Sequence, residues 1–246
     1  MPMDTVLDKS AEAPAGPGQD DRSSQPARRL IEVSGLSHRF DGRSVLEVAN
    51  WSVDRGAHAL VLGPSGSGKT TLFNILTGLA VPTSGTVMVD GVDLAALPAA
   101  RRDRTRGRLF GIVFQSLRLV SSLTVRQNLR IARSLAGKPA AEDRIADMLA
   151  ALGLDHCADA KPRRLSQGEA QRAAIARAAI VEAPIIVADE PTSALDHANA
   201  HAVIDLLMDV CGTTGATLIV ATHDDRIVDR FEHALRLTSP TAGETA

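Results

Sequence analysis

The segment from Gly63 to Thr70 carries residue types that bind phosphate groups. Its sequence, GPSGSGKT, follows the pattern G-x-x-x-x-G-K-[ST]. Glycines let backbone N–H groups turn towards an anion, because no Cβ stands in the way. Lys69 adds a positive charge for the β- and γ-phosphates, and the Thr70 hydroxyl is a hard oxygen ligand for Mg²⁺. We predict a nucleotide site formed by Gly63, Pro64, Ser65, Gly66, Ser67, Gly68, Lys69, Thr70 and Thr71.

The surroundings of this segment favour binding over a glycine-rich turn that matches the pattern by accident. An apolar run at 59–62 precedes it, and the helix-like TLFNIL at 71–76 follows it. A strand, a glycine-rich loop and a helix in this order direct the positive end of the helix towards the bound phosphates.

Two adjacent carboxylates, Asp189 and Glu190, follow a second apolar run at 185–188. The end of a parallel strand places such residues at the carboxyl edge of the sheet, where ligands of α/β folds bind. Asp189 suits the second coordination sphere of the metal, and Glu190 suits polarisation of an attacking water. The pair alone would equally fit a solvated loop, but the phosphate-binding segment favours a catalytic role.

Alternating strand-like and helix-like segments predict how these residues are positioned. Further short apolar runs lie at 111–114 and 218–221. Near-continuous apolar runs are typical of strands buried on both faces of a sheet. Helical spacing links Ile145, Met148, Leu149 and Leu152, and likewise Val203, Leu206, Leu207 and Val210. The pattern predicts an α/β fold with a mainly parallel sheet.

Two parts of the chain depart from this alternation. Residues 1–28 are rich in Pro, Gly, Ser and Ala, so we predict a disordered tail. Residues from about 116 to 165 indicate helices only, with Thr124 and Gln127 as a capping box. We interpret this stretch as a helical insertion between two core strands, and we expect residues 237–246 to be a flexible C-terminus.

Composition limits the possible partners and compartments. The net charge of −2 gives no reason to expect a nucleic-acid partner. No apolar window approaches the roughly 18 residues of a membrane span, and no secretory signal is visible, so a membrane role would require a partner protein. Cys157 and Cys211 fit no metal-ligand spacing and are interpreted as buried reduced thiols, consistent with a cytosolic compartment.

A family resemblance rests on further motifs. The sequence LSQGE at 165–169 is similar to the signature of ABC ATPases, although Ser166 and Glu169 also form a capping box; both interpretations can hold together. Ser193–Asp196 resembles the D-loop of this family, Thr222–Asp224 its histidine switch, and Gln115 its Q-loop glutamine. The resemblance covers about residues 29–236 and includes every expected motif in order.

The resemblance implies a P-loop NTPase core with a mainly parallel sheet, an antiparallel β part near the N-terminus and an inserted α-helical subdomain. It implies ATP and Mg²⁺ as cofactors, with Thr70, Gln115 and Asp189 as the metal-site residues. Lys69, Glu190 and His223 would be the catalytic set. Phe40 stands where the family usually has a tyrosine that stacks on adenine; as a lone aromatic in a strand it could equally belong to the core, but its ring keeps the face that stacking requires. Residues that would contact nucleotide held by another subunit are Ser166, Gly168, Glu169 and Asp196.

Some residues depart from the family pattern. Gln167 replaces the first glycine of the signature and Glu169 its commonest glutamine, but Ser166 and Gly168 are retained, so we expect activity to survive. The segments 108–115 and 123–128 look like ATPases of lipoprotein-releasing and macrolide-exporting systems. That group usually has Gly-Asn where this chain has Ser193-Ala194, as many importers do. The direction of transport stays open.

The function that the resemblance implies is that of the ATP-hydrolysing subunit of an ABC transporter. Its partners would be a second ATPase subunit, as a homodimer, and an integral membrane subunit that selects the cargo. The chain would be cytoplasmic and peripheral on the inner face of the cell membrane. Leu117, Leu119, Val120 and Leu123 offer more apolar surface than a solvated loop should. They either pack inside the helical subdomain or, as we expect, form a groove that receives a short helix of the membrane subunit.

The alternative is a soluble ABC ATPase of repair, translation or cofactor assembly. Repair members need a long coiled coil before the signature, whereas only residues 70–164 separate Lys69 from Leu165. Translation members carry two cassettes in one chain, and this chain carries one. A transport ATPase is therefore the function that we favour.

Overall fold

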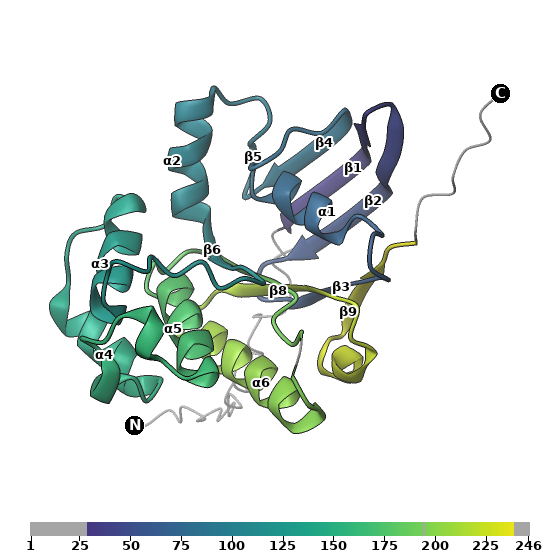
Figure 1. Cartoon of the computed structure of the whole chain (residues 1–246). Coiled ribbons are helices and arrows are strands. Elements are labelled where there is room, and N and C mark those ends of the chain that lie inside the picture. The colour runs from purple at the N-terminus through teal and green to yellow at the C-terminus, as the bar shows by residue number, and fades with distance from the viewer. Residues whose placement is uncertain (1–28, 194, 239–246) are drawn as a thin grey trace, which may run out of the picture.

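Two β-sheets, one antiparallel and one parallel, lie in separate layers with helices on both faces of the parallel sheet (Figure 1). The computed structural model describes residues 29–193 and 195–238. The predicted disordered tail at 1–28 lies outside the described residues, as do residues 239–246 of the predicted flexible C-terminus.

The antiparallel sheet has the strand order β2-β1-β4-β5. Its strands are β1 (Arg29–Phe40), β2 (Arg43–Asp54), β4 (Ser84–Val89) and β5 (Val92–Asp93). Asp41 and Gly42 connect β1 to β2, and both have positive φ values, of 48° and 77°. Asp-Gly is the favoured sequence for such two-residue hairpin turns, because Asp tolerates and Gly prefers the left-handed conformation. This turn places Phe40 at the tip of the hairpin.

The parallel sheet has the order β6-β7-β8-β3-β9. Its strands are β6 (Phe110–Val113), β7 (Ile185–Asp189), β8 (Thr217–Thr222), β3 (Ala59–Leu62) and β9 (His233–Arg236). Alternate residues face opposite sides: Leu60 and Ile186 pack among the helices α3–α6, whereas Val61 and Val187 pack towards the antiparallel sheet. Coverage of both faces explains why these strands are nearly continuous apolar runs.

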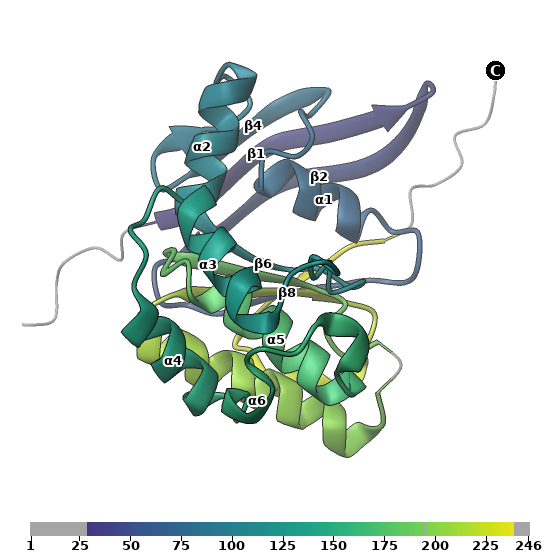
Figure 2. The same ribbon diagram turned by 60° about the vertical axis from the view of Figure 1, so that its left-hand side comes forward.

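The helices divide between the two faces of the parallel sheet (Figures 1 and 2). Helix α1 (Lys69–Leu76) lies between the parallel and the antiparallel sheets, and α5 (Gln167–Ala179) and α6 (His197–Thr214) lie on the opposite face. The remaining helical segments are α2 (Ala99–Leu109), α3 (Val125–Leu135), α4 (Glu142–Ala151), and the 3₁₀ helices η1 (Asp155–Cys157), η2 (Pro162–Arg164) and η3 (Asp225–Arg230).

The chain between β6 and β7, all of which the structure describes, contains helices and no strand. The predicted capping box of Thr124 and Gln127 is present at the start of α3. Asn128, fully buried, accepts a hydrogen bond from the Val120 N–H and donates to the carbonyl oxygens of Val120, Leu123 and Thr124. One side chain thus fixes the loop that leads from the parallel sheet into α3.

Sequence reasoning did not predict α2. Its sequence AARRDRTRGRL has no apolar stripe, and none of its residues is buried. No helix among the described residues has the length and apolarity needed to cross a bilayer. The fold class predicted from the sequence is confirmed: a parallel sheet with covering helices, an antiparallel part near the N-terminus and additional helices before β7.

The close approach of β6 to α5 gives a testable requirement for glycine. A Cβ at Gly111 would lie 2.3 Å from the carbonyl oxygen of Ala178. We predict that Gly111→Ala lowers the free energy of unfolding by about 1–3 kcal/mol, because α5 must move away from the sheet. Urea denaturation followed by circular dichroism measures the change.

Gly212, inside α6, is the matched control. A Cβ at this position has no atom within 4 Å, and its φ is not positive. Gly212→Ala should raise the free energy of unfolding by about 0.5–1 kcal/mol, through helix propensity. Equal stability of Gly111→Ala and wild type would contradict the steric account.

Candidate active site

The phosphate-binding segment connects β3 to α1 at the carboxyl edge of the parallel sheet. Gly68 is the N-cap of α1, with φ 90°, and a Cβ there would lie 2.5 Å from the carbonyl oxygen of Val45. Both the backbone angle and the contact therefore require glycine. The first N–H groups of α1 lack partners within the helix, so they form an anion-binding end.

The Lys69 ammonium lies inside this loop and is only 6% exposed. It donates hydrogen bonds to the carbonyl oxygens of Gly63 (2.8 Å) and Pro64 (3.0 Å). Its third neighbour is the Glu190 carboxylate, with Nζ to Oε1 at 3.3 Å. All of these partners are oxygen atoms. Phosphate oxygens could replace them and would still balance the positive charge of Lys69.

Asp189 ends β7 beside α1. Its Oδ2 accepts a hydrogen bond from the Thr70 hydroxyl at 3.3 Å. Burial raises the pKa of Asp189, and the Thr70 hydrogen bond opposes that shift. Asp189 Oδ1 and the Ser67 hydroxyl are buried with no hydrogen-bond partner in the described part of the chain. The unpaired Oδ1 of Asp189 and the neighbouring Thr70 hydroxyl are hard oxygen ligands of the kind that Mg²⁺ prefers.

Glu190 is the most constrained acidic residue of the site. Its φ is 49°, an unusual value for a residue with a side chain, and only 9% of it is exposed. Glu190 Oε2 accepts hydrogen bonds from the Thr222 hydroxyl (3.0 Å) and the His223 backbone N–H (3.4 Å), and it lies 2.8 Å from His223 Nδ1. Residues at the end of β8 thereby hold the Glu190 carboxylate, which directly follows β7.

Sequence reasoning missed Thr222 as a contributor to the site. In the sequence it is only the residue before the switch histidine, but its buried hydroxyl also accepts a hydrogen bond from the Asp224 N–H at 3.1 Å. A threonine at the end of a buried strand gave no further signal, because β-branched residues are common in strands. His223 itself keeps 57% of its side chain exposed although its Nδ1 contacts the buried Glu190 carboxylate.

Gln115 and Phe40 lie at the border of the site. Gln115 follows β6 by two residues and is exposed, and the pairing of Val113 with Ala188 places it beside the chain that continues to Glu190. Phe40 is 67% exposed at the end of β1. An exposed aromatic ring at a hairpin tip has a free face for stacking.

Arg177 on α5 is a second residue that the sequence did not reveal. Its guanidinium donates to the carbonyl oxygens of Arg118 and Ile112, and its burial lowers its pKa. Leu117 and Arg118 both have positive φ values, and the Arg118 guanidinium lies 4.4 Å from the centre of the Phe114 ring. Arg177 thus ties α5 to the strained segment that follows Gln115.

The signature residues lie at the start of α5. The Ser166 hydroxyl accepts a hydrogen bond from the Glu169 N–H, and Glu169 Oε2 accepts from the N–H and hydroxyl of Ser166, at 2.7 Å each. Ser166, and then His156, lower the pKa of Glu169 to about 2. Asp196 caps α6 by accepting from the Asn199 N–H at 2.8 Å. The capping box predicted for Ser166 and Glu169 is confirmed.

Within one chain the predicted site residues form two separate groups. Lys69, Thr70, Asp189, Glu190 and His223 come together at one sheet edge. Among the described residues, no hydrogen bond or ion pair joins Ser166, Glu169 or Asp196 to that group. Helix α5 lies on the opposite face of the sheet from α1 (Figure 1).

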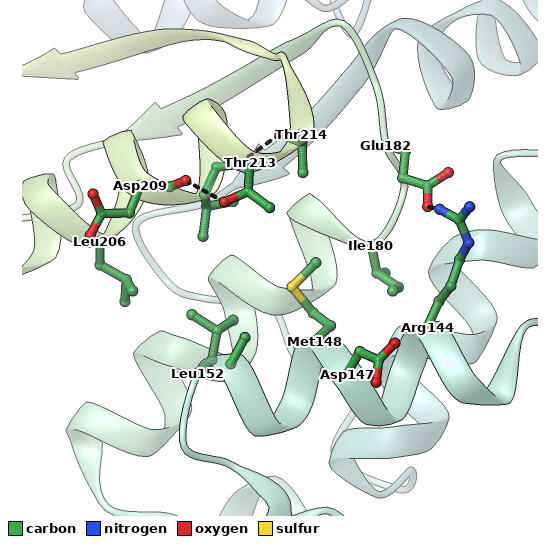
Figure 3. A pocket seen from close by; sticks show the side chains of 12 residues that line it. Arg144, Asp147, Met148, Leu152, Ile180, Glu182, Leu206, Asp209, Thr213 and Thr214 are labelled. Atoms are coloured by element: carbon green, nitrogen blue, oxygen red, sulfur yellow. Dashed lines mark hydrogen bonds and ion pairs between the residues drawn. The ribbon is translucent and has the colours of Figure 1, made fainter.

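A separate hollow of about 780 Å³ lies between α4, the end of α5 and α6 (Figure 3). Its floor is apolar, with Met148, Leu152 and Leu206, and Arg144 pairs with Glu182 at its rim. None of the predicted site residues lines it. This hollow therefore plays no part in the predicted nucleotide site.

A parallel sheet with a glycine-rich loop before α1, a buried lysine and paired carboxylates on the neighbouring strand defines a P-loop NTPase. A family model described as ABC transporter matches residues 46–193. The chain belongs to the ABC transporter family of ATP-binding proteins.

Three curated relatives agree with this assignment. The chain is 40% identical over 213 residues to the lipoprotein-releasing system ATP-binding protein LolD 1 of Rhodopirellula baltica, covering 82% of this chain and 93% of the relative. It is 36% identical to the ABC transporter ATP-binding protein YtrE of Bacillus subtilis, covering 80% and 90%. It is 38% identical to the macrolide export ATP-binding/permease protein MacB of Brucella melitensis, covering 86% of this chain and 33% of the relative.

Solved structures lead to the same family. The dimeric ABC transporter cassette MJ0796 has a TM-score of 0.76 and 30% identity, covering 85% of this chain and 94% of that chain. A post-hydrolysis state of the same cassette, bound to ADP and Pi, has a TM-score of 0.77 and 30% identity, covering 85% and 96%. The predictions of an ATP-binding, ATP-hydrolysing subunit of an ABC transporter are confirmed, and the alternative of a soluble ABC ATPase is not favoured.

Proposed function

We propose that two copies of this chain close around ATP and Mg²⁺, and that closure drives a separate membrane subunit. The main support is the division of the predicted site residues into two groups that do not meet within one chain. A second copy would supply the missing half to each phosphate-binding loop. The dimeric form of the MJ0796 cassette supports such an arrangement.

In the first half of the site, Lys69 would turn from the carbonyl oxygens of its loop to the phosphates of ATP. Thr70 and Gln115 would hold Mg²⁺, with Asp189 in its second sphere; the unpaired buried Oδ1 of Asp189 supports this fit. When bound, Mg²⁺ would neutralise charge on the phosphate oxygens. Phe40, on its exposed hairpin tip, would stack on the adenine.

Glu190 would polarise the water that attacks the γ-phosphate. The hydrogen bonds from Thr222 and the His223 backbone fix its carboxylate, and its partial burial keeps competing water away. A carboxylate held in advance loses little energy to reorganisation during the reaction. His223 would contact the γ-phosphate and the water from the exposed side of the site.

In the second half of the site, Ser166 and the Gly168 N–H would reach the γ-phosphate held by the partner. Glu169 would keep Ser166 in place through the capping box, and Asp196 would line the interface. Gln167 is the first residue of α5, where any L-residue adopts the helical backbone, so replacing the usual glycine causes no backbone strain. A Cβ at Gly168 would meet only the Arg172 guanidinium, at 3.6 Å.

The membrane partner would bind a groove of about 550 Å³ beside α3. Phe114, Val120, Ile131 and Leu135 line it, and the last three are 42%, 39% and 74% exposed. Val120 thus fits the groove expected from the sequence, whereas Leu119 packs against the core. A short amphipathic helix could place its apolar face here, next to the segment that follows Gln115.

Binding there would hold the chain at the inner face of the cell membrane. The relatives named as lipoprotein-releasing and macrolide-export ATP-binding proteins support a membrane subunit of that type. The cargo would be selected by the membrane subunit.

The proposed role of Glu190 can be tested by Glu190→Gln. This variant should bind Mg-ATP like wild type, lose about 10²-fold or more in kcat and accumulate a dimer, because the phosphate contacts remain while the water is no longer polarised. Phosphate release and size-exclusion chromatography with ATP measure both effects. Near-normal turnover, with monomer only, would contradict the assignment.

The composite site can be tested by mixing variants in a Glu190→Gln background. Ser166→Arg should bind ATP but form no homodimer, because a bulky cation occupies the phosphate pocket from the partner side. Lys69→Ala should also fail to dimerise, because its loop no longer holds ATP. The mixture should form a heterodimer, since one interface joins an intact loop to an intact signature. A Ser166→Arg homodimer that closes normally would refute the arrangement.

The groove can be tested by Val120→Glu together with Leu135→Glu. Both side chains are exposed, so the double variant should melt within about 2 °C of wild type and retain its basal ATPase activity. Membrane pelleting with the co-expressed membrane subunit should show loss of association.

Leu119→Glu serves as the contrasting variant, because it places a charge against the core and should lower the melting temperature strongly. A folded, active double variant that still pellets with the membrane would show that this groove does not bind the membrane subunit.

A further inference from the structure

Three side chains of different chemistry converge beside the start of α5, apart from the phosphate-binding loop. His156 and Cys157 belong to η1, and Glu169 belongs to the first turn of α5. One ligand atom from each, the imidazole nitrogen, the thiol sulfur and a carboxylate oxygen, lies within 4.8 Å of the other two. We propose that His156, Cys157 and Glu169 form a binding site for a borderline-soft divalent ion of the zinc type.

The side chains need only a small adjustment to bind such an ion. His156 Nε2 and Glu169 Oε1 are already 2.7 Å apart. Tetrahedral zinc, with bonds of roughly 2.0–2.3 Å, separates its ligand atoms by about 3.5 Å. The imidazole and the carboxylate must therefore move apart slightly, and no pair of ligand atoms starts more than 4.8 Å apart, so side-chain rotations alone can reach this geometry. The thiol contributes only one weak hydrogen bond, to the Leu154 carbonyl at 3.5 Å.

The backbone that carries these ligands is held from several sides. Leu154 and Ala158, on either side of η1, are buried in the core. The N–H groups of Val125 and Arg126 donate to the carbonyl oxygens of Ala160 and Ala158, at 3.0 and 2.9 Å. The capping box fixes the start of α5. Rigid support on both sides is what a preorganised metal site requires.

Access and charge also favour a cation at this position. His156 is exposed, and Cys157 is 9% exposed, so an ion can enter from solvent. Burial is the main cause that raises the pKa of Cys157; Glu169 and Asp155 add to the shift, and the Arg172 guanidinium opposes it. A bound cation would offset the negative charge of Glu169 and Asp155 and stabilise the thiolate. With three protein ligands, a fourth position stays open to water or to another donor.

The site would link η1 to the helix that carries the signature. Glu169 divides its two oxygens: Oε1 faces His156, and Oε2 accepts from Ser166. An ion bound at Oε1 would leave the hydrogen bonds of Oε2 to Ser166 in place. Metal binding would therefore brace the signature turn rather than dismantle it.

Metal titration of the untagged full chain, without nucleotide, tests the proposal. Isothermal titration with Zn²⁺ should show one ion per chain. Excess Zn²⁺, about a hundred times the dissociation constant, should raise the melting temperature by about 5–10 °C. Co²⁺ should produce the near-ultraviolet charge-transfer absorption of a cobalt–thiolate bond. This absorption identifies Cys157 as a ligand, because the other thiol, Cys211, is only 1% exposed and lies inside the core.

Variants assign the ligands. Cys157→Ser should abolish the Co²⁺ charge-transfer band, and His156→Gln, an exposed change, should weaken Zn²⁺ binding by at least about tenfold. Glu169→Gln should weaken it similarly while keeping a capping side chain. His201→Gln is the matched control, because His197 and His201 stack on α6 with ring centroids 4.4 Å apart and form the competing histidine pair.

Two results would overturn the proposal: wild-type protein without the Co²⁺ charge-transfer band, or Zn²⁺ binding that His201→Gln removes and His156→Gln leaves unchanged. His156→Gln keeps the experiment decisive even if Cys157→Ser folds poorly. Metal binding is measured on single chains without ATP, so its failure would leave the proposed dimer mechanism intact, and the reverse also holds.

Discussion

The buried contact between Lys69 and Glu190 is the constraint on which the rest of the site depends. An ammonium and a carboxylate removed from water are costly unless oxygens and donors surround them. Lys69 meets this requirement with the carbonyl oxygens of its own loop, and Glu190 meets it with Thr222 and His223. Lys69 lies in the loop and helix that follow β3, Glu190 follows β7, and Thr222 ends β8. These strands are adjacent in the parallel sheet, in the order β7-β8-β3, so their carboxyl ends meet. The sheet order is therefore what makes the charged cluster possible.

The side chains proposed to contact a partner's nucleotide are also helix caps. Ser166 caps α5 and Asp196 caps α6, and each does so at a helix start where unpaired N–H groups favour an anion. These helices lie on the face of the sheet away from α1. A single chain thus has a glycine-rich loop at one sheet edge and a separate capped helix start on the other face, which is the physical basis for proposing that two copies share each ATP.

Arg177 connects the helix that carries the signature to the segment around Gln115. It joins the signature helix to the carbonyl oxygens of Ile112 and Arg118, on either side of Gln115. The segment that it holds includes two residues with positive φ, so the segment keeps this shape only while such contacts persist. The apolar groove that contains Val120 begins at the same segment. Movement of a partner in the groove would reach Gln115 and α5 together.

The sequence by itself determined the features that short-range chemistry controls. The glycine-rich loop, the apolar strand runs, the two capping boxes and the order of the motifs were all predictable, because each depends on residues a few positions apart. Helix α2 escaped prediction because its basic sequence has no buried face. Only the tertiary structure showed that Thr222 and Arg177 support the site, that Leu119 packs inside while Val120 lies in a groove, and that His156 and Cys157 face Glu169. These contacts join segments that are distant along the chain. Such pairings are decided by how side chains pack in the folded protein, and the local sequence pattern does not indicate them.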